Sequence, residues 1–199
     1  MNDERPFHRS SFIIHRFEDN MAFDIRETRL RNDNKNIREL VNRSEFIRVL
    51  NTEGDPPEKY LIQFTCRGVE NIKANGEPIY RSDHKVSIYL HAEYPLKQPQ
   101  LKWMTPIFHP NIHVTGAVCI GAWWAAKTLD ELLLTLGEMV QYKNYDPRDP
   151  MNSKAASWAL RNKGLFPVDK RSLKGQSLEE LIVLGDTEAE SDDFGINIL

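Results

Sequence analysis

The chain has 199 residues, of which 40% are hydrophobic and 28% charged, and its formal net charge is −3. This composition is typical of one globular domain with additional segments and does not indicate a nucleic-acid-binding protein. The polar N-terminus lacks the features of a secretory signal, and no apolar run is long enough to cross a membrane. With only two cysteines, a disulfide framework or zinc site is excluded, so we expect a cytoplasmic protein.

Charge is distributed unevenly along the chain. Residues 165–199 contain three basic and eight acidic residues, a net charge of −5 that leaves +2 on residues 1–164. We therefore expect an acidic C-terminal tail over 165–199, acting either as a solvated appendage or as a docking segment.

The first predicted element is a helix. Residues 1–23 are mixed and polar and are expected to form an N-terminal extension. From Asp24 to Arg43 the apolar residues fit one helical face, although imperfectly. They are Ile25, Leu30, Ile37, Leu40 and Val41.

Four strands are predicted to follow this helix. The first covers 44–50 and is followed by a turn at Gly54-Asp55-Pro56-Pro57. The second covers 60–66, where alternation places Cys66 on the same side as Ile62 and Phe64. Asn75-Gly76 predicts a tight turn before the third strand at 86–90, and the fourth covers 100–104.

The second half of the chain predicts a long loop and two helices. Residues 105–127 are rich in turn residues, and Thr128 with Glu131 forms a capping box before a helical apolar pattern that ends near Val140. Asn152 predicts the N-cap of a last helix, for which Gly164 is a plausible stop. The fold class is therefore α+β, a four-stranded antiparallel meander sheet with an N-terminal helix and C-terminal helices.

A set of short motifs resembles the ubiquitin-conjugating enzymes. It comprises Tyr94-Pro95, then His109-Pro110-Asn111, then Cys119 eight residues beyond the asparagine, and finally Asp149-Pro150. The resemblance covers residues 24–162, and it implies the fold of that family for a catalytic domain at 24–164.

The chain departs from the eukaryotic pattern of that family at several positions. Leu96 stands where many members have Phe, Trp124 is followed by Ala125-Ala126, and the stretch from Cys119 to Thr128 is short. In these features the chain looks like the divergent bacterial members associated with antiviral, defence-type conjugation operons. The resemblance also places Leu96, Trp123 and Trp124 on a partner-binding surface, although either tryptophan could instead be a packing residue and loop anchor.

Cys119 is the candidate nucleophile. A thiolate is a strong nucleophile and a good leaving group, so a cysteine can receive an acyl group and pass it on. The alternative is a buried small hydrophobe, the commonest fate of a free cysteine. The signature around Cys119 favours catalysis, whereas Cys66 lies on the apolar face of a strand and is expected in the core.

Two polar residues are candidates for assisting Cys119. Asn111 could donate its amide to a developing oxyanion or, equally, could hydrogen-bond nearby backbone and hold the loop. Asp149 could orient an incoming lysine and accept a hydrogen bond from it, or it could cap the following helix or brace the loop.

His109, Pro110 and His113 are expected to support the active site structurally. His109 is interpreted as a structural ring tied to backbone rather than a general base. His113 could line, with Asp149, the entrance for the incoming lysine. The spacing of the two histidines does not indicate a metal site, because Pro110 lies between them and excludes a shared helical face.

The resemblance implies an enzyme that accepts a ubiquitin-like protein on Cys119 and transfers it to a lysine. Its implied partners are the modifier, an ATP-dependent activating enzyme, a target protein and, for some reactions, a ligase. No metal, cofactor, nucleic acid or membrane is implied. The alternative is an inactive adaptor of the same fold, and an unrelated redox protein ranks third because a Cys-x-x-Cys pair is lacking.

Overall fold

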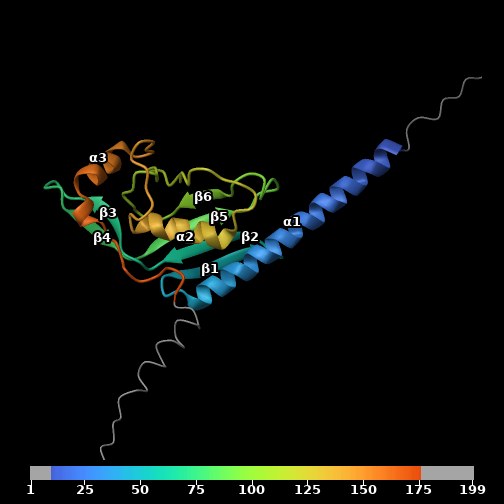
Figure 1. Ribbon diagram of the computed structural model, residues 1–199, viewed down its shortest axis with the longest axis horizontal. Coiled ribbons are helices and arrows are strands. Elements are labelled where there is room, and N and C mark those ends of the chain that lie inside the picture. The colour runs from blue at the N-terminus through green and yellow to red at the C-terminus, as the bar shows by residue number, and fades with distance from the viewer. Residues whose placement is uncertain (1–9, 176–199) are drawn as a thin grey trace, which may run out of the picture.

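A long helix precedes the strands and two shorter helices follow them in the computed structural model, which describes residues 10–175 (Figure 1). This arrangement confirms the predicted α+β class, with an N-terminal helix, a four-stranded antiparallel sheet and C-terminal helices. The elements are α1 Ser10–Arg43, β1 Ile47–Gly54, β2 Pro57–Phe64, β3 Gly68–Ile72, β4 Pro78–Arg81, β5 His84–Tyr89, β6 Gln100–Trp103, α2 Leu129–Val140, α3 Ser153–Arg161 and the 3₁₀ turn η1 Lys163–Leu165.

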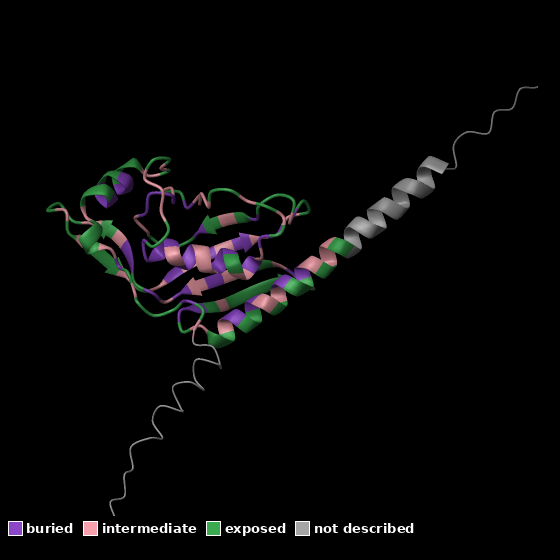
Figure 2. Cartoon of the chain, in the orientation of Figure 1, coloured by how far each residue is buried: buried purple, intermediate pink, exposed green. Residues whose placement is uncertain are grey.

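The main sheet is a meander with strand order β1-β2-β5-β6, in which every neighbouring pair is antiparallel. Alternation along β2 buries Tyr60, Ile62 and Phe64, as predicted, and Val86 and Ile88 of β5 lie on the same face. The buried residues of α1 and α2 pack on this face, so that the core lies between the sheet and the two helices (Figure 2).

Helix α2 confirms the clearest sequence signal. The backbone N–H of Thr128 donates to Glu131 Oε2 at 2.9 Å, completing the predicted capping box. The apolar residues at helical spacing are all buried: Leu129, Leu132, Leu133, Leu136, Met139 and Val140.

Helix α1 and strand β1 differ from their predicted bounds. The helix begins at Ser10 rather than near Asp24, and β1 covers 47–54 rather than 44–50. The strand starts later because Ser44 N–H donates to Leu40 O at 2.9 Å and extends the helical turn. Ile25, assigned to the buried face, is 65% exposed.

A second, two-stranded sheet formed by β3 and β4 was not predicted. The Asn75-Gly76 turn lies inside this hairpin, between Lys73 and Glu77, rather than directly before the third strand of the main sheet. Gly68 and Asn71 have low strand propensity, which explains why β3 was missed. The hairpin is fixed to the C-terminal region, since Trp158 Nε1 donates to Gly76 O at 3.0 Å.

The chain returns to the core after α3. Asn152 caps α3 by accepting from Ala155 N–H at 3.1 Å, as predicted, and Gly164 lies in η1, beyond the helix end. Phe166 then joins an aromatic cluster and Leu173 is buried against the main core. Residues 165–175 are therefore packed on the domain, while the predicted acidic tail from 176 onward and residues 1–9 of the predicted extension lie outside the described residues.

Between residues 10 and 175, no helix has both the length and the apolar character that crossing a bilayer requires.

Candidate active site

Cys119 lies in a cleft of about 130 Å³ beside α2. Its thiol is free and partly exposed, and its backbone N–H donates to Asn111 O at 2.9 Å. The cleft brings together Cys119, Asn111 and Asp149, the three residues predicted to carry the chemistry. Its complete lining is Asn111, Cys119, Ile120, Gly121, Thr135, Met139, Asn144, Asp146 and Asp149.

The side chain of Asn111 holds the loop that precedes α3. Its Nδ2 donates to the carbonyls of Asp146 at 2.9 Å and Asp149 at 3.2 Å, and its Oδ1 accepts from Asp146 N–H at 2.7 Å. Both amide hydrogens are therefore engaged with backbone, and the residue is buried. In this geometry the amide determines where the backbone of Asp149 lies.

The two carboxylates of the cleft differ in their partners. Asp146 Oδ1 accepts from the backbone N–H of Arg148 at 2.9 Å and from its Nε at 3.2 Å, and these contacts lower the pKa of Asp146. The exposed carboxylate of Asp149 accepts no hydrogen bond from any described residue. Asn152 provides the cap of α3. Asp149 is thus the carboxylate that an incoming cation can reach without displacing an internal partner.

His109 and Pro110 form the back of the site. His109 Nδ1 accepts from Asn111 N–H at 3.1 Å, so the ring proton is assigned to Nε2. The ring is fully buried against Tyr142, and burial lowers the pKa of His109 to about 3. Pro110 O accepts from the backbone N–H groups of Met151 and Asn152 at 2.8 and 2.9 Å. A neutral ring without solvent contact has the properties of a structural residue rather than a base.

His113 does not line the cleft, contrary to the prediction that it lies with Asp149 at the entrance for the incoming lysine. Its Nδ1 contacts Thr115 Oγ1 at 2.8 Å, and the side chain lines a separate hollow. His113 and Cys119 thus line different cavities. Among residues 10–175, no three His, Cys, Asp or Glu side chains are grouped as metal ligands.

Cys66 has a different environment from Cys119. It is 1% exposed within the core, and burial raises the pKa of the Cys66 thiol to about 11. Such a thiol is protonated at pH 7 and inaccessible, so Cys66 is a core residue as predicted.

The three residues predicted to bind a partner lie on two adjacent turns. Leu96 is 82% exposed and Trp124 57% exposed. Trp123 is anchored between them, because its Nε1 donates to Pro95 O at 2.8 Å and its ring packs on Tyr94. Trp123 therefore joins the two turns, and Leu96 and Trp124 remain available at the surface.

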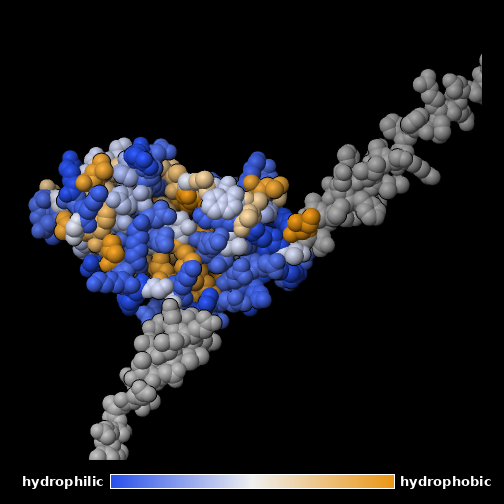
Figure 3. All heavy atoms as spheres, viewed as in Figure 1, coloured by the Kyte–Doolittle hydropathy of each residue, from blue (hydrophilic) through white to orange (hydrophobic). Residues whose placement is uncertain are grey.

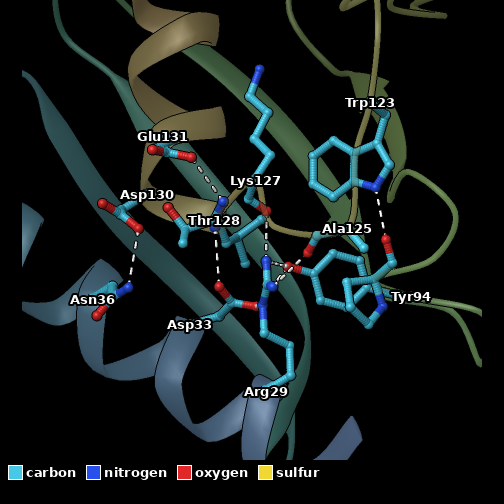
Figure 4. A network of polar contacts seen from close by, with 12 residues as sticks. Arg29, Asp33, Asn36, Tyr94, Trp123, Ala125, Lys127, Thr128, Asp130 and Glu131 are labelled. Atoms are coloured by element: carbon cyan, nitrogen blue, oxygen red, sulfur yellow. Dashed lines mark hydrogen bonds and ion pairs between the residues drawn. The ribbon is translucent and has the colours of Figure 1, made fainter.

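An ion pair on α1, between the half-buried Arg29 and the buried Asp33, fixes both of these turns (Figure 4). Asp33 Oδ2 accepts from Arg29 Nε at 2.7 Å and from the Tyr94 hydroxyl at 2.6 Å. Asp33 Oδ1 accepts from Leu129 N–H, the first residue of α2, at 3.1 Å. Burial, together with this carboxylate, raises the pKa of Tyr94, which keeps its hydroxyl protonated as a donor.

Arg29 completes the connection to the segment that follows Cys119. Its guanidinium donates to Ala125 O at 2.7 Å and to Lys127 O at 2.5 Å. These two hydrogen bonds attach the segment before α2 to α1. Neither Arg29 nor Asp33 was singled out from the sequence, where an i,i+4 charged pair on a helix reads as an ordinary surface pair.

Asp146, Asn144, Thr135 and Met139 were also missed as members of the cleft. Of these, only Asp146 had a usable signal, because it belongs to the same Asp-Pro-Arg-Asp-Pro segment as Asp149.

Comparison with known proteins is consistent with this geometry. The sequence model of a family described as ubiquitin-conjugating enzyme matches residues 65–171. Ubiquitin-conjugating enzyme E2 T of Bos taurus is 29% identical over 97 residues, which are 45% of this chain and 49% of that protein. NEDD8-conjugating enzyme UBC12 of Eremothecium gossypii is 28% identical over 121 residues, 57% of this chain and 65% of that protein. The match thus spans about half to two thirds of the length of these relatives.

Two solved structures share the fold. The structure of S. cerevisiae Ubc12 has a TM-score of 0.52 at 18% identity and covers 80% of this chain and 88% of that chain. A structure described as a novel ubiquitin-conjugating enzyme has a TM-score of 0.52 at 24% identity, with coverages of 70% and 88%.

Proposed function

Because the chain belongs to the ubiquitin-conjugating enzyme family, we propose that Cys119 accepts a ubiquitin-like protein as a thioester and transfers it to a target lysine. Proteins of this family conjugate ubiquitin-like proteins. The observation that carries the proposal is the shared cleft, in which a partly exposed thiol lies with a carboxylate that has no described partner. A thiol and a carboxylate in this relation suit acyl transfer to an amine.

The transfer step assigns a role to each residue of the cleft. The lysine nitrogen attacks the thioester carbonyl, the new C–N bond forms, the C–S bond breaks, and the Cys119 thiolate leaves. Asp149 orients the incoming amine and accepts a hydrogen bond as the nitrogen loses its proton to solvent. The engaged amide of Asn111 supports a bracing role, which keeps Asp149 in place, over direct donation to the oxyanion.

The partners follow from this chemistry. An ATP-dependent activating enzyme must supply the modifier, and a ligase surface at Leu96 and Trp124 is supported by their exposure. The sequence departures near these residues support a divergent bacterial, defence-type member, which stays a prediction. Two free thiols support a reducing compartment, so that a cytoplasmic location also stays a prediction.

The first experiment is a charging assay. The protein is mixed with ATP and with ubiquitin or NEDD8, each with its own activating enzyme, and is separated on a non-reducing gel. We expect an adduct of the combined mass that disappears with reducing agent. Cys119→Ser should lose this adduct or form a thiol-resistant ester, whereas Cys66→Ala should retain it.

Two outcomes would oppose the proposal. A reducible adduct that persists in Cys119→Ser would place the thioester elsewhere. A modifier that binds the protein without ever forming an adduct, with either activating enzyme, would favour the inactive adaptor instead. Discharge of the adduct onto free lysine then separates a transferase from a protein that only holds the modifier.

A further inference from the structure

A second hollow lies beside the cleft and contains none of the residues to which we assign chemistry. This side groove has a volume of about 550 Å³, in the range of binding sites rather than of packing defects. It is formed by the 70–71 portion of β3, the segment 102–108, the turn 113–116 and Asn152. The lining of the groove is mixed, with apolar side chains such as Met104 and Val114 beside polar ones such as Asn71. On the face of the molecule drawn in Figure 3, apolar residues likewise occur as separate patches among hydrophilic ones.

The rim of the side groove exposes apolar side chains that the fold does not require. Val114 is 81% exposed and Met104 is 57% exposed. Gly116 N–H donates to His113 O at 2.8 Å and closes a turn with Val114 at its second position. Proline or a polar residue is favoured there, and a β-branched apolar side chain gains nothing from the turn itself. Val114 and Met104 are therefore both available at the groove for contact with another molecule.

One wall of the side groove is the edge of β3, along which backbone hydrogen-bonding groups have few partners in the described chain. β3 pairs with β4 along one edge. Along the other edge, the described chain contributes a single backbone hydrogen bond, from Phe108 N–H to Val69 O at 2.7 Å. Glu70 and Asn71, next along this edge, line the groove. An unpaired strand edge is suited to an extended polypeptide, whose main chain can pair with it.

The side groove and the cleft are joined by one short stretch of chain. Asp149 lines the cleft and Asn152 lines the groove. Both are fixed to the same hairpin, through Asn111 Nδ2 to Asp149 O at 3.2 Å and Asn152 N–H to Pro110 O at 2.9 Å. Three residues along the chain separate their Cα atoms by at most about 11 Å. A polypeptide that presents a lysine to Asp149 therefore reaches the groove within a few residues.

We propose that the side groove binds the target protein next to the acceptor lysine, as an extended segment with an apolar side chain between Val114 and Met104. At about 3.4 Å per residue, that side chain lies roughly three to five residues from the lysine. This inference rests on the proposed function, because it assigns to the same transfer reaction a site that selects the acceptor. The acceptor class is thus a lysine in a flexible or strand-like segment with a nearby large aliphatic residue.

The test compares two acceptors of the ubiquitin or NEDD8 thioester. Free lysine reaches only the cleft, whereas peptides of eleven residues with a central lysine and one leucine at varied positions can also reach the groove. We expect peptides with leucine three to five residues from the lysine to discharge the thioester about tenfold faster than a leucine-free peptide, the effect of burying one aliphatic side chain. Val114→Glu should abolish this preference and leave discharge to free lysine unchanged.

Leu160→Glu is the matched control, since Leu160 is also exposed, at 59%, but lies on α3 outside the groove. The same peptides are titrated into the uncharged, ¹⁵N-labelled protein, where shifts at Asn71, Met104 and Val114 are expected. This titration tests peptide binding in the side groove even if neither modifier charges Cys119. In that case the proposed function fails, and the shifts still show whether the groove binds the peptide. Three results would overturn the inference. All peptides could discharge the thioester equally without causing these shifts, the shifts could be caused only by the intact modifier, or the protein could self-associate through the groove.

Discussion

Two irregular segments form the active face, and they are held in different ways. The loop 144–152 is fixed from within the site, by the amide of Asn111 and the carbonyl of Pro110. The segment 125–129 is fixed from outside it, by Arg29 and Asp33 on a helix almost one hundred residues earlier in the chain. The first arrangement uses neutral hydrogen bonds, and the second an ion pair.

This difference separates two kinds of mutational effect. The hydrogen bonds from the Asn111 side chain to the loop 144–152 form an internal brace. Changes in this brace displace Asp149 and therefore slow the transfer step, with modest effects on the rest of the fold. Changes in the ion pair release Tyr94, Ala125 and the start of α2 together, so they affect stability and the Leu96–Trp124 surface. Four measurements test the division, beginning with the largest expected effect.

Asp33→Ala tests the external attachment most severely. It leaves the Arg29 guanidinium unpaired and Leu129 N–H without its acceptor. We expect the free energy of unfolding, measured with guanidinium chloride, to fall by about 3–5 kcal/mol. Glu58→Ala is the matched control, because it removes the more exposed ion pair of Arg26 on the same helix and should cost at most about 1 kcal/mol. Equal losses would mean that the pair has no special role.

Asn111→Ala tests the internal brace. We expect transfer from the thioester to free lysine to slow by about 10- to 100-fold, no more than the loss of the Asp149 carboxylate itself, with amide exchange of Asp146 accelerated because its N–H loses Asn111 Oδ1. The two observations must occur together if the residue acts by bracing. Slow transfer with normal amide exchange would instead identify Asn111 as the oxyanion donor.

Asp149→Ala removes a cleft carboxylate without removing a hydrogen bond of the brace, which uses its carbonyl. We expect charging of Cys119 to survive while transfer to lysine slows by about 10- to 100-fold, as for positioned proton-transfer groups. Asp146→Asn is the control, since that carboxylate is already engaged by Arg148 and its loss should have a much smaller effect. An equal loss of charging would indicate that Asp149 supports the fold.

The smallest effect concerns pH and the buried rear wall. The folded-state pKa of His109, about 3, is below its unfolded value of about 6.5, so its contribution to stability is complete above pH 6.5 and is lost as the pH falls. Burial lowers the pKa of His84 in the same direction. We expect unfolding free energy to decrease by about 1.4 kcal/mol per pH unit between pH 6 and 5 from His109 alone, with a further decrease from His84 in the same direction.

His109→Gln should reduce that slope. The window above pH 5 is chosen because carboxylates with lowered pKa values, such as Asp146 and Asp169, begin to lose their contribution only at lower pH. If the unfolding free energy of His109→Gln depended on pH as steeply as that of the wild type, the buried His109 ring would not be the cause of this dependence.

Short-range chemistry explains which features could be predicted from the sequence. The capping box and apolar spacing of α2, the alternation of β2 and the burial of Cys66 each depend on residues close together in the chain. The gathering of Cys119, Asn111 and Asp149 was predictable through the resemblance of their motifs to a known family, although their catalytic roles stay predictions.

Long-range contacts explain the remainder. Nothing within a short window indicates that Arg29 donates to a carbonyl 96 residues away, so the part that α1 plays in fixing the segment before α2 was not predicted. The β3–β4 hairpin depends on Trp158 and Leu165 for its anchoring, through the Gly76 carbonyl and the Tyr80 hydroxyl. His113 was misplaced because a turn can direct a side chain to either side of a hairpin.

The segment after α3 has a consequence for synthesis of the protein. Leu173 completes the core beside Gly137, and Arg171 lies over the Phe46 ring and pairs with Glu45, 126 residues earlier. A ribosome adds about 5–20 residues per second, so the first helix and strand emerge many seconds before the side chains that cover them. The nascent chain therefore exposes part of its core until residues 171–173 have left the ribosome, and the folded state is reached only after that point.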